Sequence, residues 1–62
     1  MCLSTVFYNS TVKENEIMRD VAQIEAEGRG FWLISLFGEK KFVEGTIKAI
    51  DLVEEHYVVL GH

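Results

Sequence analysis

Apolar residues in this chain occur mostly in short runs rich in β-branched and aromatic side chains, a pattern typical of β-strands. The first run covers residues 2–8 and ends at Asn9-Ser10. Later runs are separated by turn residues such as Gly28-Arg29-Gly30. The pattern predicts strands over 2–8, 22–27, 31–37, 41–53 and 56–60.

Residues 14–26 allow a second interpretation. Ile17, Val21 and Ile24 follow the i, i+4, i+7 spacing of one helix face. Three positions are a short sample, however, and the glycines at 28 and 30 suit a hairpin between 21–27 and 31–37. We therefore favour a strand over 22–27, preceded by a turn or a single helical turn near 14–19.

Residues 31–37 are apolar on both faces, which predicts a strand covered on one side by the core and on the other by a subunit interface. Gly45 interrupts the run over 41–53, and a glycine inside a strand often marks a bend. Short strands joined by tight turns predict an all-β fold, a small and strongly bent antiparallel barrel.

The length and composition of the chain indicate that a second subunit is needed. The chain has 62 residues and a single cysteine, so we expect one domain over 1–62 without an internal disulfide. A domain of this size buries only about 60% of its unfolded surface and usually needs a metal or a partner subunit. Because 48% of the residues are hydrophobic, we expect some of them to contact a second copy in a homodimer.

The charge and the apolar runs exclude several classes of protein. A net charge of −4 makes nucleic-acid binding unlikely, because a phosphate backbone needs a basic surface. The longest apolar run is too short to cross a membrane, and the N-terminus lacks the pattern of a secretory signal. We therefore expect a cytoplasmic protein. The sequence has no glycine-rich phosphate loop, no CxxC and no base positioned beside its thiol, so we expect no enzymatic activity.

Cys2 is the most informative residue because of its position. Met1 precedes a small side chain, a context in which the initiator methionine is commonly removed. Cys2 would then offer its α-amine, its thiolate and the deprotonated backbone amide of Leu3, a donor set that suits Ni(II) or Cu(II). On composition alone, a lone cysteine in a first strand is more often a small apolar residue.

The order of several segments along the chain resembles the CooT family. These segments are Met1–Val6, Val21–Gly30, Leu36–Phe42, Ile50–Leu52 and Val58–Leu60. The resemblance implies a five- to six-stranded Sm-like or SH3-like β-barrel. It also implies a homodimer that binds one Ni(II) between its two N-terminal cysteines and assists nickel insertion into carbon monoxide dehydrogenase, as a metallochaperone or nickel sensor. Cys2 and the backbone amide of Leu3 are the positions that match the family's metal site.

Other residues leave alternatives open. His56 follows a predicted turn and is expected to be exposed, and His62 could contribute to a metal site only if the C-terminus lay near Cys2. The alternative function is an Sm-like RNA-binding or protein-interaction module without a metal. Four aromatic residues could then stack on bases, although packing in the core or the dimer interface is the preferred interpretation: Phe31, Trp32, Phe37 and Phe42.

Overall fold

A computed structural model describes residues 3–62 and confirms the all-β fold class. One short 3₁₀ helix, η1 (Lys13–Asn15), lies at the start of the region 14–19 where a turn or single helical turn was predicted, but residues 16–21 belong to the second strand, which is longer than the predicted 22–27. The strands are β1 (Ser4–Tyr8), β2 (Glu16–Glu27), β3 (Gly30–Ser35), β4 (Lys40–Glu44), β5 (Thr46–Asp51) and β6 (Tyr57–Gly61).

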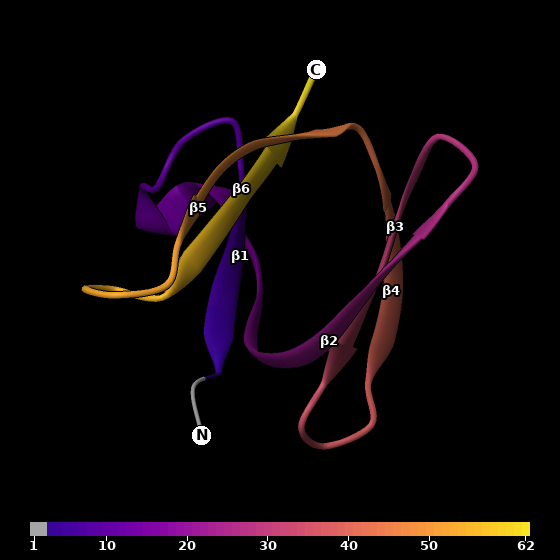
Figure 1. Cartoon of the computed structure of the whole chain (residues 1–62), viewed down its shortest axis with the longest axis horizontal. Helices are drawn as coiled ribbons and strands as arrows, with labels where there is room; N and C mark the ends of the chain where they lie inside the picture. Colours follow the sequence, from indigo (N-terminus) through magenta and orange to yellow (C-terminus); the bar gives the residue numbers. More distant parts are fainter. Residues whose placement is uncertain (1–2) are drawn as a thin grey trace.

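All six strands form one curled sheet in the order β4-β3-β2-β1-β6-β5 (Figure 1). The sheet differs from the predicted barrel in two respects. Strands β1 and β6 pair in parallel, while the other neighbours are antiparallel. The edge strands β4 and β5 do not pair with each other, so the sheet stays open. The chain bends between them at Gly45, as predicted, with a φ of 144° and with its N–H donating to Arg29 O at 3.0 Å. Strands β4 and β5 diverge from this corner and each pairs with its own inner neighbour.

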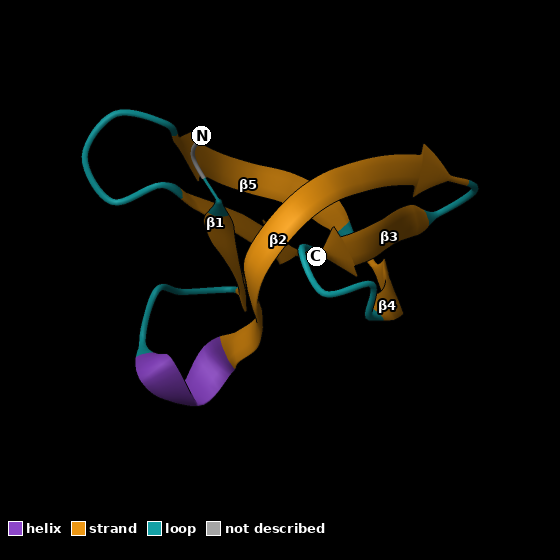
Figure 2. Ribbon diagram, turned by 90° about the horizontal axis from the view of Figure 1, so that it is seen from below, coloured by secondary structure: helices purple, strands orange, loops and turns teal. Residues whose placement is uncertain are grey.

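Strand β2 is long and sharply bent, which lets it pair with β1 near its start and with β3 near its end (Figure 2). The bend falls at Asp20, whose φ of 57° lies in the left-handed region. The carbonyl oxygen of Asp20 accepts a hydrogen bond from Leu36 N at 2.8 Å. An extra residue at this point forms a β-bulge, which increases the local twist of the strand. The helix considered over 14–26 is therefore excluded.

The left-handed conformation at Asp20 predicts a graded response to substitution. Asp20→Val should lower the free energy of unfolding by about 1–2 kcal/mol, because a β-branched side chain is disfavoured at positive φ. Asp20→Asn should stay within about 0.5 kcal/mol of the parent, since asparagine tolerates this region. Urea unfolding followed by circular dichroism measures both. Equal stability of the two variants would contradict the assigned bend.

The core lies on the concave face of the sheet. Its buried residues are Val6, Val21, Leu33, Val58 and Leu60. On β3, Phe31 and Leu33 point to this face, so Trp32 and Ile34 point to the other one. The predicted strand over 31–37 is too long, because β3 ends at Ser35. The buried Ser35 hydroxyl accepts hydrogen bonds from the backbone N–H groups of Phe37 and Glu39, both at 3.1 Å, and this turns the chain.

Candidate functional site

The chain start joins the sheet at one end of β1. Cys2, the predicted metal-binding residue, lies outside the described residues. Leu3 is half-buried and directly precedes β1, and its backbone is the described part of the predicted site. Ser4 pairs with Val21, and Val21 pairs with Ser35 on the following strand. The beginning of β1, the bend of β2 and the end of β3 therefore lie at the same end of the sheet.

The parallel pairing of β1 with β6 brings His56 to this end as well. Thr5 pairs with Tyr57, and the Thr5 N–H donates to the His56 carbonyl oxygen at 3.1 Å. His56 has a φ of 54° and is half-buried. Predicted to be an exposed turn residue, it is instead level with Ser4 on the neighbouring strand.

His62 lies at the opposite end of β1. Its Nε2 is 3.1 Å from the Tyr8 hydroxyl, and the two rings meet edge to face. Because an extended chain rises about 3.3 Å per residue, the five steps from Leu3 to Tyr8 correspond to roughly 17 Å. The C-terminus therefore lies at the end of β1 opposite to Leu3.

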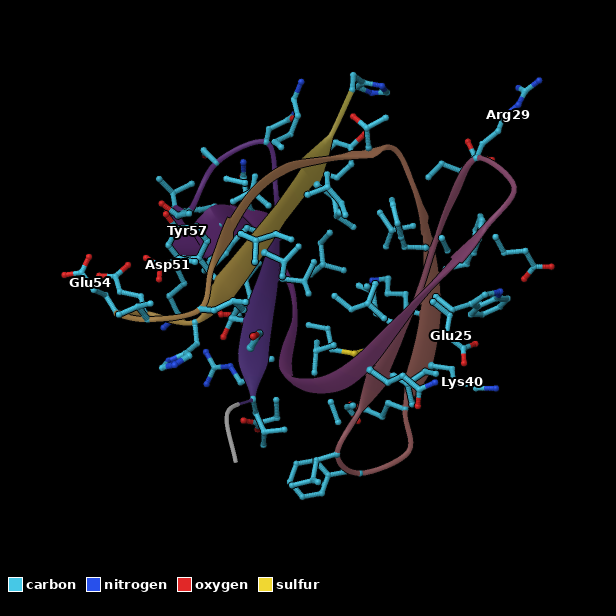
Figure 3. All side chains as sticks on the ribbon, in the orientation of Figure 1. Glu25, Arg29, Lys40, Asp51, Glu54 and Tyr57 are labelled. Carbon is cyan, nitrogen blue, oxygen red and sulfur yellow. The ribbon has the colours of Figure 1, made fainter. Side chains whose placement is uncertain are left out.

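The loop between β5 and β6 is shaped by Asp51. Its Oδ1 accepts hydrogen bonds from the backbone N–H groups of Val53 and Glu54, each at 3.0 Å. The backbone N–H groups of Glu54 and Val53 hold the pKa of the Asp51 carboxyl below its usual range, and the nearby His56 has a smaller effect in the same direction. Asp51 thus fixes a compact turn directly before His56 (Figure 3).

Two turns project at the end where the chain begins, and both carry exposed apolar side chains. Leu36 and Phe37, between β3 and β4, are 51% and 76% exposed. Leu52 and Val53, between β5 and β6, are 66% and 85% exposed. In the strand order β4-β3-β2-β1-β6-β5, the start of β1 lies between the ends of β3 and β5 that lead into these two turns. Water-exposed apolar side chains at one end of a small domain are typical of a contact surface.

The predicted aromatic cluster is divided between three places. Phe31 packs against the core, and Phe37 lies in the exposed turn. Trp32 and Phe42 pack together on the convex face, with ring centroids 5.2 Å apart. Strand alternation directs neighbouring side chains to opposite faces, so residues that are close along the chain do not form one cluster.

Within residues 3–62, no three His, Cys, Asp or Glu side chains gather closely enough to hold a metal ion. The same part of the chain contains no helix long and apolar enough to cross a membrane.

Comparison with known proteins identifies the family of this chain. The model of the CO dehydrogenase accessory protein CooT family matches residues 1–60. The chain belongs to the CooT family. It is also 36% identical over 61 residues to an uncharacterised protein of Methanocaldococcus jannaschii, a match that covers 98% of this chain and 100% of that relative. The family is described as accessory to CO dehydrogenase, which agrees with the accessory role implied by the resemblance of the sequence.

Proposed function

We propose that this CooT protein is a homodimeric nickel carrier or nickel sensor for the maturation of carbon monoxide dehydrogenase. One Ni(II) ion binds between the Cys2 residues of two subunits and is held as cargo. Membership of the CooT family supports the accessory role. The observation that carries the shared site is the end of the sheet where β1 begins, because the turns after β3 and β5 project there and carry exposed apolar side chains.

This surface supports a two-fold contact at the chain start. A second copy that covers Phe37 and Val53 removes the two most exposed large apolar side chains from water. The same contact brings the two N-termini together, because Leu3 lies between these turns. The two edge strands, β4 and β5, are less suited to contact a second copy than this surface is. Lysines at 40 and 41 protect β4, and a bulge at Lys48 protects β5.

The donor atoms of the proposed site fit Ni(II). After removal of Met1, each Cys2 supplies an α-amine and a thiolate, and the backbone nitrogen of Leu3 is a further donor. Sulfur and nitrogen donors in a planar array suit Ni(II), and two chains can complete a four-coordinate site. The ion is released to a client when these donors are protonated or exchanged.

Nickel binding should therefore depend on both Met1 and pH. Protein processed to begin at Cys2 should bind Ni(II) with a sulfur-to-nickel charge-transfer band. Its affinity should rise as the pH is raised from mildly acidic to mildly alkaline, since amine and thiol must lose protons to bind. Protein that retains Met1 lacks the free Cys2 amine and should bind at least about tenfold more weakly. Calorimetric titration of the two forms tests this, and equal affinities would contradict the chelate.

The convex face of the sheet gives less support to the alternative function, an Sm-like RNA-binding module. The aromatic pair Trp32 and Phe42 is the part of the convex face suited to stacking on bases. Glu25 lies beside Trp32 in the same row, Glu27 and Glu44 lie in the next row, and the Trp32 Nε1–H donates to Glu27 Oε1 at 2.6 Å. Carboxylates at this position repel a phosphate backbone.

A further inference from the structure

The convex side of β2, β3 and β4 carries an aromatic pair surrounded by carboxylates. Cross-strand pairing places Glu25, Trp32 and Phe42 in one row across the three strands. The next row places Glu27 and Glu44 on either side of Gly30. Strand alternation puts all these positions on the face opposite the core, which takes Phe31 and Leu33 instead. We call this surface the aromatic–acidic face: Trp32, Phe42, Glu25, Glu27 and Glu44.

Packing holds the two rings in place while leaving them accessible. Phe42 remains 37% exposed, and its ring lies over Gly30, where an added Cβ would come within 2.9 Å of Phe42 Cζ. Trp32 is half-buried, and the Glu27 carboxylate fixes the edge of its indole. The aromatic–acidic face is therefore built from rigid strands and requires little ordering to bind a partner.

Charge on this face has one sign in two adjacent rows, the row of the rings and the row of Gly30. Glu25, Glu27 and Glu44 are exposed. Glu25 hydrogen-bonds only to the neutral amide of Gln23 among the described residues, and Glu27 to the indole. Two cations adjoin these rows: Lys40 in the following row, opposite Ile34, and Arg29 in the turn next to Gly30. Figure 3 shows Glu25 and Lys40 pointing outward from these strands.

We propose that the aromatic–acidic face docks a basic segment of a partner protein, with an arginine or lysine side chain over the Trp32 and Phe42 rings. A cation over an aromatic face is attracted by the ring, and arginine stacks on tryptophan especially well. Carboxylates on both sides of the rings can accept hydrogen bonds from the guanidinium group. This docking is independent of the nickel site proposed above, since it uses the convex face of β2–β4 and not the chain start.

The experiment titrates the protein with an acetylated oligoarginine peptide, and with the neutral oligocitrulline peptide as a comparison. Trp32 is the single tryptophan of the chain, so its fluorescence reports directly on this face. We expect a saturable change with oligoarginine, which weakens as salt is added, and none with oligocitrulline. Heteronuclear NMR shifts should fall on β2, β3 and β4.

Two matched variants separate this site from general attraction to an acidic protein. The first variant replaces Glu25, Glu27 and Glu44 by glutamine. The second variant replaces Glu14, Glu39 and Glu54, which lie outside the aromatic–acidic face, by glutamine. Each changes the formal net charge from −4 to −1. The first should lower the affinity for oligoarginine by about tenfold or more, and the second by less than about threefold. Phe42→Leu, which keeps an apolar side chain without a π face, should also weaken binding.

Three results would overturn the proposal. An equal loss in the two charge variants would mean that only net charge attracts the peptide. NMR shifts at the chain start would place the peptide elsewhere. If the first variant changes the self-association of the protein and the second does not, the aromatic–acidic face binds a second copy of this chain and not a basic partner. Sedimentation of the peptide-free proteins measures this last outcome.

Discussion

Replacing Cys2 by serine is expected to lower the affinity for Ni(II) by at least about 100-fold and to remove the sulfur-to-nickel charge-transfer band. The variant keeps the α-amine and the Leu3 amide but loses the only thiolate of the chain. In the proposed dimer, one substitution removes both sulfur donors from the shared site. Calorimetry and absorption spectroscopy on methionine-processed protein measure the two effects.

A matched control keeps a thiol in the chain but moves it. The double variant Cys2→Ser, Ser4→Cys has the same cysteine content as the parent, but the thiol can no longer close a ring with the terminal amine. We expect no recovery of nickel affinity. Tight binding by this double variant, or by Cys2→Ser alone, would mean that the N-terminal cysteine is not the nickel ligand.

The second large effect is expected at Gly30. This buried glycine lies where β3 passes close to β4, and an added Cβ would collide with the Val43 carbonyl oxygen and come within 2.8 Å of Glu44 Cα. Both are backbone atoms that cannot move without breaking the pairing. Gly30→Ala should therefore destabilise the fold by about 3 kcal/mol. A domain of this size has roughly 3–9 kcal/mol of stability, so this substitution removes between about a third and all of it and should clearly lower the unfolding temperature.

Gly28 supplies the control for this prediction. It lies in the adjacent turn with a φ of 59°, and an added Cβ would meet no atom within 4 Å. Gly28→Ala should cost only about 1 kcal/mol, from the left-handed backbone alone. Thermal unfolding followed by circular dichroism compares the two variants. A Gly30→Ala protein as stable as Gly28→Ala would contradict the β3–β4 pairing.

The sequence predicted where the strands lie better than it predicted which side chains point to the core. The β-bulges in β2 explain this difference. Ile17, Val21 and Ile24 are spaced by four and three residues, yet all belong to the core or pack against it. Register shifts in β2 supply the additional residues that keep them on one side. A bulged strand therefore imitates the spacing of a helix, which is why residues 14–26 allowed two interpretations.

The sequence could not predict which chain segments lie near the end of the sheet where the nickel site is proposed. The position of His56 beside the chain start depends on the parallel pairing of β1 and β6, two strands at opposite ends of the sequence. Local alternation of apolar residues carries no information about such a pairing. By contrast, Cys2 could be singled out from its place at the start of the chain, and family membership supports the accessory role in which it is proposed to act.

Native mass spectrometry of the methionine-processed protein, with and without Ni(II), tests the central claim most directly. One spectrum reports removal of Met1, the number of subunits and the number of bound metal ions. The account predicts a dimer that carries a single Ni(II) ion. A nickel-loaded monomer, or a dimer that takes up no nickel, would contradict it.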